Sequence, residues 1–553
     1  MADFVIKING SDNISAEQNQ SIERLSEDPK CNCWIYGKDG TFCSVRNGED
    51  AIASIGYACH IDSYSIRETL SNILSSFNET QIGDLKKKLV GQYVLLIKKG
   101  NNIYIFSDFM GARNIFYSDD GFVVASSFSK VEDLIQTRAN DLDIYKVMEF
   151  LAMRHVLYPA WIGRSTEHKR IKWLLPYEYL VIDTATLSFR LGSIVYKIDN
   201  KKQTDCSLLS NELLSILKTV IDRREFKNSP VAASLTGGRD SRLVAAIAAE
   251  QFPNIHYRTA VSLNTFSSLK DMKVADKIAK IQGISLDVYR FQAGQDEEKF
   301  REFTEGFAPS YNHSITPLIN SADSYSLGFG GVYGTELFMP IPWNSIDEYI
   351  QQRIAGARQA LRIEDGFWNI FRDALYNEFQ RTKEHFQLSD GDERDYIRLF
   401  NLLDTVRYSS FILSAFNRTG YQLEPYSNYA ILDLALRVAP ALWGNHRKLG
   451  GDALVQQGAM ALLNQRLASV LTYKTFRPML PLSMSSYPLY LVGFTLQVAY
   501  WLKERLEDKK TKPTKTVLPG GYYLSDGWEK NFIERTVKRY GKLWVNEIGC
   551  RND

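Results

Sequence analysis

The chain has 553 residues, which is too long for one ordinary domain, so we expect two or more hydrophobic cores. With 44% hydrophobic and 24% charged residues, its composition is that of a soluble globular protein. Lys and Arg number 66 against 64 Asp and Glu, so the net charge is +2 and no field of one sign would attract nucleic acid. Nucleic acid is therefore not an expected partner.

The N-terminal segment has no basic stretch followed by an apolar one, and the six cysteines are too sparse for a disulfide framework. The Cys31–Cys33 pair lacks the second pair of ligands that a zinc site needs. We therefore expect a reduced, cytoplasmic protein. The longest apolar stretch, 487–502, falls short of the roughly 18 to 20 residues that span a bilayer and contains Gln497. We expect a buried or amphipathic helix there rather than a transmembrane segment, with a membrane-surface helix as the alternative.

The first 200 residues are dominated by short segments of strand length that are rich in β-branched and aromatic residues. These segments are 93–98, 103–107, 122–126 and 179–183. The pattern predicts an antiparallel, β-rich N-terminal domain over residues 1–200. The polar, aperiodic segment 197–204 marks its boundary.

The pattern changes after this boundary. Residues 208–221 have apolar residues at helical spacing, 231–235 form a short apolar run, and 242–250 form an alanine-rich helix. A strand, a glycine turn and a helix in that order predict an α/β unit with a parallel sheet. We expect this second domain over residues 205–480, with a helical C-terminal extension over 481–553.

The segment 234–241, SLTGGRDS, joins the apolar strand directly to the helix. Two adjacent glycines let the backbone approach a phosphate, and the loop N–H groups and the helix N-terminus face that anion with positive polarity. Thr236 and Ser241 add hydroxyl donors, whereas Asp240 beside a polyanion implies a bridging Mg²⁺. No Gly-Lys-Ser/Thr follows, so the loop is not a Walker motif. It matches the PP-loop of ATP pyrophosphatases, which cleave ATP between the α and β phosphates.

With this loop in place, the chain resembles the asparagine synthetase family over roughly residues 85–480. The passages 106–117, 122–131 and 149–183 resemble its glutaminase domain and joining segment, and 267–271 with 275–283 resemble the segment beside the adenosine. The resemblance implies an Ntn-hydrolase-like N-terminal domain followed by a PP-loop, HUP-type domain. It implies ATP and Mg²⁺ as cofactors and is compatible with a homodimer. The residues expected to contact the nucleotide are Ser234, Leu235, Thr236, Gly237, Gly238, Asp240, Ser241 and Gly334.

The segment 332–338 occupies the place of the family's second acidic loop, Gly-x-Gly-Ser-Asp. It resembles the β-lactam synthetase version, in which a tyrosine precedes Gly-Ser/Ala-Asp and deprotonates the attacking amine. That alignment makes Tyr333 the base and Glu336 the second Mg²⁺ ligand beside Asp240, whereas a shift of one residue places Thr335 at the metal position. The stretch 463–478 matches the one that carries the family's essential lysine, which falls on Lys474.

Family members that hydrolyse glutamine need a Cys whose α-amine is exposed once Met is removed. Position 2 is Ala2, so we expect no glutaminase activity. The expected function is an ATP-dependent ligase that adenylates a small-molecule or peptide carboxylate, releases pyrophosphate and transfers the acyl group to an amine or ammonia. Two alternatives remain open: a lactam- or macrolactam-closing cyclase, and a noncatalytic scaffolding relative.

Overall fold

The computed structural model describes the greater part of the chain. The described residues are 3–8, 21–26, 31–37, 40–135, 137–261, 266–292, 294–307, 315–361, 363–416, 420–443, 453–472, 478–480, 486–492, 495–496, 516–518, 522–524 and 536. Within them the chain is a mixed α/β protein, with antiparallel sheets in its N-terminal part and a parallel sheet further along. The expected order, antiparallel sheets before a parallel sheet, is therefore confirmed, whereas the domain bounds stay a prediction.

Two six-stranded sheets with antiparallel pairing make up the N-terminal region. The first has the order β12 (Ile171–Trp173), β10 (Phe116–Ser118), β11 (Val123–Ala125), β1 (Asp3–Ile8), β3 (Cys31–Gly37) and β2 (Ser21–Ser26). The second has the order β14 (Ser188–Ser193), β13 (Glu178–Asp183), β9 (Asn102–Ser107), β8 (Tyr93–Lys99), β5 (Asp50–Gly56) and β4 (Phe42–Asn47). Side chains from both sheets form one buried cluster, which includes Phe4, Cys33, Ala53 and Leu96. Strands alternate their side chains between two faces, so this cluster indicates a sandwich.

The four strands expected from the sequence in this region are all present as β8, β9, β11 and β13. Their neighbours in chain order form the outer layers and connections: α1 (Ile66–Ser76), α2 (Ile82–Lys88), α3 (Phe128–Leu134), α4 (Ile144–Val156), β6 (Cys59–His60) and β7 (Leu89–Val90). Helix α1 contacts β4 and β5, and α3 contacts β11, so each sheet has a helix on one side.

A five-stranded sheet with parallel pairing follows. Its order is β18 (Leu286–Arg290), β17 (Ile255–Val261), β16 (Val231–Ser234), β19 (Leu327–Phe329) and β21 (Tyr421–Leu423). The first strand in the chain thus lies in the centre, with later strands added first on one side and then on the other. In such doubly wound sheets, ligands bind beyond the carboxyl ends of the strands where the order reverses, which here is between β16 and β19.

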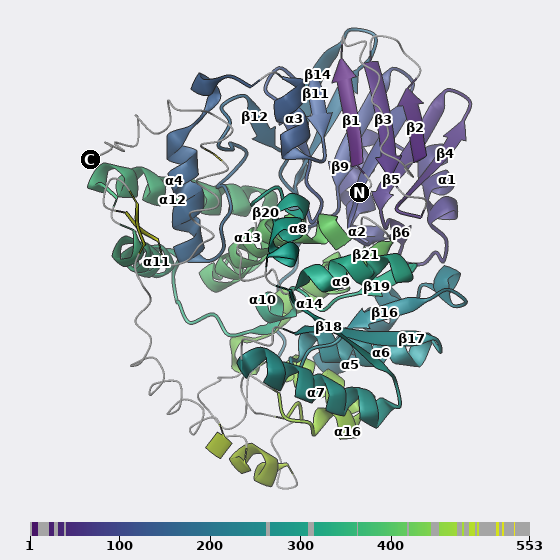
Figure 1. Cartoon of the computed structure of the whole chain (residues 1–553), viewed down its shortest axis with the longest axis vertical. Helices are drawn as coiled ribbons and strands as arrows, with labels where there is room; N and C mark the ends of the chain where they lie inside the picture. The colour runs from purple at the N-terminus through teal and green to yellow at the C-terminus, as the bar shows by residue number, and fades with distance from the viewer. Residues whose placement is uncertain are drawn as a thin grey trace.

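The strands of this sheet are connected and followed by helices, some of which pack on the sheet while others extend toward α4 (Figure 1). They are α5 (Cys206–Ile221), α6 (Asp240–Gln251), α7 (Phe266–Gln282), α8 (Gln295–Phe303), α9 (Thr316–Asn320), α10 (Gly334–Phe338), α11 (Ile346–Ala360), α12 (Asp365–His385), α13 (Glu393–Phe416), α14 (Tyr429–Arg437), α15 (Leu454–Leu463) and α16 (Gln465–Ala468). The strand β15 (Tyr196–Ile198) pairs with β20 (Phe386–Leu388), so the expected boundary segment is joined to the helical region. One hydrophobic cluster runs from the second antiparallel sheet into the parallel sheet, so the two parts share a core.

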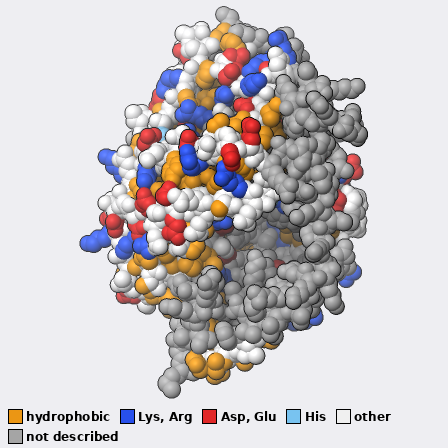
Figure 2. Space-filling view, turned by 90° about the vertical axis from the view of Figure 1, so that its left-hand side faces the viewer, with side chains coloured by type: hydrophobic (Ala, Val, Ile, Leu, Met, Phe, Trp, Pro, Cys, Tyr) orange, Lys and Arg blue, Asp and Glu red, His pale blue; other side chains and the backbone are white. Residues whose placement is uncertain are grey.

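On the face shown in Figure 2, basic and acidic side chains alternate across the surface without a large field of one sign. Within the described residues, no helix is both long and apolar enough to cross a bilayer. In the described part of the expected C-terminal helix, Tyr490 is buried, whereas Tyr487 and Val492 are exposed.

Candidate nucleotide and substrate site

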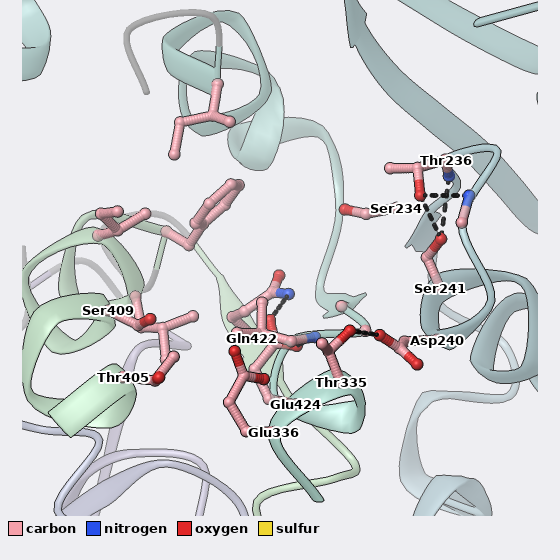
Figure 3. A pocket seen from close by; sticks show the side chains of 18 of the residues that line it. Ser234, Thr236, Asp240, Ser241, Thr335, Glu336, Thr405, Ser409, Gln422 and Glu424 are labelled. Carbon is pink, nitrogen blue, oxygen red and sulfur yellow. Dashed lines mark hydrogen bonds between the residues drawn. The ribbon is translucent and has the colours of Figure 1, made fainter. Parts of the chain in front are cut away.

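A cavity of about 700 Å³ lies at the reversal point of the parallel sheet (Figure 3). Its walls come from the turn after β16, the turn after β19, the end of β21 and one side of α13. The polar part of the lining includes Ser234, Thr236, Arg239, Asp240, Ser241, Thr335, Glu336, Thr405, Ser409, Gln422, Glu424 and Thr472. A cavity of this size, with a few convergent polar groups, is typical of small-molecule sites.

The turn after β16 is closed by hydrogen bonds among its own hydroxyl groups. The Ser241 Oγ accepts from the Thr236 backbone N–H at 3.1 Å and lies 2.7 Å from the Thr236 Oγ1. The Thr236 Oγ1 also accepts from the Gly238 N–H at 3.1 Å. The strand, turn and helix expected from the sequence are present, and both hydroxyls lie at the loop as predicted. Leu235 is buried beneath the loop, so its contribution is to packing.

The loop already holds one carboxylate. The Gly237 N–H donates a hydrogen bond to the Asp271 carboxylate, which comes from α7. A backbone N–H beside a helix N-terminus is a favourable place for an anion. The contact with Asp271 shows that the Gly237 N–H can donate to a carboxylate oxygen. A bound pyrophosphate would have to replace that contact.

The buried Arg242 fixes the loop from below. Its guanidinium donates to the backbone oxygens of Gly237, Leu467 and Val470, at 3.3, 3.3 and 2.6 Å. Burial lowers the pKa of Arg242 to about 9, with the charge of Arg239 acting in the same direction. The side chain thereby ties the PP-like loop to α16 and the residues that follow it.

Asp240, the first residue of α6, lies against the turn after β19. Its Oδ2 accepts a hydrogen bond from the Thr335 Oγ1, and its Oδ1 accepts one from the Gln456 Nε2, both at 2.8 Å. Figure 3 shows Thr335 facing Asp240, with Glu336 on the side of Thr335 that is turned away from it. The structure therefore brings Asp240 together with Thr335 rather than with Glu336, and it favours the alignment shifted by one residue. Glu336 lines the same cavity.

The two turns approach closely because glycines stand at their contacts. A Cβ on Gly331 would lie 2.5 Å from both the N and the Cα of Ser241. A Cβ on Gly334 would lie 2.6 Å from the Asp240 Cγ and Oδ1. Gly334 was expected at the nucleotide, and the structure places it directly against Asp240.

Tyr333 is not one of the described residues that line the cavity. Its side chain is 1% exposed and packs in the hydrophobic core. Burial, and then the charge of Glu424, raise the pKa of Tyr333 well above its usual value. Ser409 of α13 acts in the opposite direction, but a hydroxyl is no substitute for a carboxylate partner. This environment favours the neutral phenol and weighs against the base expected from the sequence. Its backbone is in the left-handed region, with φ 79°, at a cost of about 1 to 2 kcal/mol.

Glu424 and Gln456 are site residues that the sequence interpretation missed. Glu424 is 3% exposed, and burial raises the pKa of its carboxyl to about 7. A strand end followed by Pro425 was a usable signal, since polar residues at strand carboxyl ends face the ligand side of a parallel sheet. Gln456 belongs to a polar pair inside an otherwise apolar helix, a pattern that also points to an internal partner.

Lys474 lies outside the described residues, so its proposed position remains a prediction. Among the described residues, no group of three or more His, Cys, Asp or Glu side chains is arranged to hold a metal ion. A magnesium site here would therefore depend on few protein ligands.

No model of a known protein family matches the chain, and no curated protein matches it in sequence. Among solved structures, the allosteric regulatory enzyme of purine biosynthesis is similar at 10% identity and a TM-score of 0.24, over 52% of this chain and 80% of that one. The U34-tRNA thiolase NcsA of Methanococcus maripaludis is similar at 14% identity and a TM-score of 0.20, over 35% and 80%. Glutamine phosphoribosylpyrophosphate amidotransferase of B. subtilis, complexed with ADP and GMP, has 14% identity and a TM-score of 0.20, over 52% and 59%. These TM-scores are too low to establish a shared fold, so function is argued from the site.

Proposed function

We propose that the protein is an ATP-dependent ligase that adenylates a carboxylate, releases pyrophosphate and transfers the acyl group to an amine or ammonia. The observation that carries this proposal is the SLTGGRDS turn between β16 and α6, which opens into the cavity at the reversal point of a parallel sheet. A β-rich Ntn-like region before a PP-loop region is the arrangement that this activity has in the asparagine synthetase family, which the sequence resembles.

The residues of the turn have distinct roles in this reaction. In the proposed complex the N–H groups of 236–238 and the hydroxyls of Thr236 and Ser241 bind the β and γ phosphates, which leave together as pyrophosphate. This binding replaces the hydrogen bonds that the three N–H groups donate to Ser241, Asp271 and Thr236. The substrate carboxylate attacks the α-phosphorus from the side of the cavity lined by α13. Fixed donors around the leaving group stabilise its developing charge, and Lys474 remains the proposed cation for that purpose.

The described residues can accommodate a magnesium ion with a small number of protein ligands. Asp240 supplies a carboxylate, and the hydroxyl oxygen of Thr335, 2.8 Å from the Asp240 Oδ2, can serve as a second oxygen ligand. The Gln456 Nε2 donates to the Asp240 Oδ1 at 2.8 Å, so its role is to hold the carboxylate rather than to bind the metal. Magnesium is commonly held by one or two carboxylates together with substrate phosphates, so this set fits. When bound, the ion would neutralise phosphate charge. Thr335 takes the position that the sequence interpretation gave to Glu336.

The proposal is tested by exchange of labelled pyrophosphate into ATP, with Mg²⁺ and separate panels of amino, hydroxy, dicarboxylic, aromatic and fatty acids. We expect exchange with at least one panel, and AMP as the nucleotide product. Asp240→Asn should reduce exchange about 100-fold or more, as loss of a fixed charge at a reacting phosphate does. Asp365→Asn is the matched control, since this carboxylate is exposed on α12. ADP and phosphate as products would contradict the proposal.

A noncatalytic relative is a second candidate, favoured by two observations. Asp271 already occupies the Gly237 N–H, and Thr335 rather than an acid faces Asp240. If ATP binds without exchange under any panel, this candidate is preferred. Intramolecular lactam closure would instead give exchange with a single acid that carries its own amine.

A further inference from the structure

Glu424 follows β21 directly, and its carboxyl group is fixed in the cavity wall. Its Oε2 accepts a hydrogen bond from the Val332 backbone N–H, and its Oε1 accepts one from the Gln422 Nε2, both at 3.0 Å. A carboxylate has about four acceptor positions, so two fixed donors leave room for a proton. In Figure 3 Glu424 is labelled near Gln422 and Thr335, whereas Thr236 and Ser241 of the turn after β16 lie farther from it.

The fold makes room for this carboxyl group at the expense of a neighbouring side chain. A Cβ on Gly330 would lie 2.0 Å from the Glu424 Oε1 and 2.3 Å from its Oε2, so an alanine there would displace the carboxyl group from this position. The backbone of Glu424 is also held from the N-terminal region, because its N–H donates to the Gln92 Oε1 at 2.9 Å. The space left by Gly330 and the hydrogen bond from the Glu424 N–H to Gln92 fix the position of the carboxyl group, but neither donates a hydrogen bond to its oxygens.

Two residues of the turn after β19 cannot accept a proton as readily. In the alignment favoured by the contact of Thr335 with Asp240, Val332 falls where the β-lactam synthetase branch has its tyrosine. Valine has no titratable group. Tyr333 is buried outside the described cavity lining, and its raised pKa favours the phenol over the phenolate that would serve as base.

We infer that Glu424 is the general base of the acyl-transfer step, in which an amine attacks the acyl-adenylate. This inference rests on the proposed function. The neutral amine nitrogen forms a bond to the acyl carbon, and the bond from that carbon to the phosphate oxygen breaks, with its electron pair leaving on AMP. One proton passes from the attacking nitrogen to the Glu424 carboxylate. The products are an amide, AMP and a protonated Glu424.

The electrostatic surroundings suit a base at neutral pH. Burial raises the pKa of Glu424 to about 7, while its hydrogen bonds and the charge of Arg258 on β17 act in the opposite direction. The charged groups that line the same cavity are Arg239, Asp240 and Glu336. A base works best when its pKa lies near the working pH. Amide formation should therefore increase as pH rises through about 7.

The test separates the two half-reactions in Glu424→Gln, which keeps the shape but cannot take up the proton. Adenylation is followed by pyrophosphate exchange with the acid that the panels identify, and transfer by amide formation with ammonium and with primary amines. We expect exchange within a few-fold of the parent and amide formation lower by about 100- to 10,000-fold, the usual contribution of a general base. The part of the pH dependence of transfer that titrates near 7 should also disappear, which leaves only the rise caused by deprotonation of the free amine.

Hydroxylamine provides the decisive comparison, because its adduct is acidic enough to lose a proton to water. Glu424→Gln should still form the hydroxamate from hydroxylamine at close to the parental rate. The matched control is Glu225→Gln, a partly buried carboxyl in a separate cavity that accepts hydrogen bonds from Tyr57 and Ile66. It should change neither half-reaction.

Three results would overturn the inference. Equal loss of exchange and transfer in Glu424→Gln would show a structural role only. Equal loss of amide and hydroxamate would show that proton removal is not the affected step. Absence of pyrophosphate exchange in the parent protein with every acid would refute the proposed function and, with it, the role of Glu424. The first two results would refute only the role of Glu424, because the parent protein would still show exchange.

Discussion

Replacement of Gly331 by alanine tests whether the close approach of the two turns matters. The added Cβ would lie 2.5 Å from the Ser241 backbone, whereas ordinary contact begins at 3.4 Å, so the turn after β19 must retreat by about 0.9 Å. Overpacking of this kind costs about 1 to 3 kcal/mol, because the colliding atoms belong to the backbone and cannot rotate away. With a shift of about 2 to 4 °C per kcal/mol for a domain of this size, the melting temperature should fall by several degrees.

The catalytic effect should exceed the effect on stability. A displacement near 1 Å between groups that position a reaction costs about 100-fold in rate, so pyrophosphate exchange should fall by that order while most of the protein stays folded. Gly356→Ala is the control, because this helical glycine in α11 has no atom within 4 Å of the added Cβ. It should raise stability by about 0.5 to 1 kcal/mol and leave exchange unchanged. If both variants exchange at the parental rate, the turns do not form one site.

Arg242→Met removes a hydrogen-bond donor from three backbone oxygens, of which the Leu467 oxygen still accepts from the Val470 N–H, and the free energy of unfolding should fall by about 1 to 3 kcal/mol in urea titrations. Burial raises the pKa of Asp404 to about 7 against about 4 when unfolded, so the folded state holds an extra proton between these values. The contribution of this carboxyl group to the free energy of unfolding is fully present below pH 4 and is lost as pH rises through 7. In Asp404→Asn the urea midpoint should therefore change less with pH between pH 5 and 8 than it does in the parent protein. Lys474→Ala should lower turnover about 100- to 1000-fold with little change in ATP affinity in equilibrium binding, and a parental rate would refute this role.

The sequence predicted local elements better than it predicted contacts between them. The strands at 93–98 and 179–183 were predictable because each is a short β-branched run bounded by turn residues. The six residues of β1 were not predicted as a strand, although β1 lies in the middle of the first sheet. Its role depends on pairing with β3 and β11, which no local pattern reveals.

The same distinction holds for the site. Asp240 and the hydroxyls beside it were predictable, because a glycine turn between strand and helix has a local signature. The choice between Thr335 and Glu336 was not, since the two are adjacent in the chain and only the packing of α10 on α6 determines which side chain faces Asp240. Tyr333 was predicted as the base from its place in the motif alone, whereas its burial depends on the tertiary fold.

The contact of Gln92 with Glu424 has a consequence for the N-terminal region. Gln92 comes from the turn before β8, and its side chain both accepts from the Glu424 N–H and donates to the Glu424 carbonyl and to Ser427. The N-terminal region thus holds the backbone of Glu424, a residue that lines the neighbouring cavity. Mutations that destabilise the N-terminal sandwich should therefore also disturb the cavity beside the parallel sheet, although they lie far from it in the sequence.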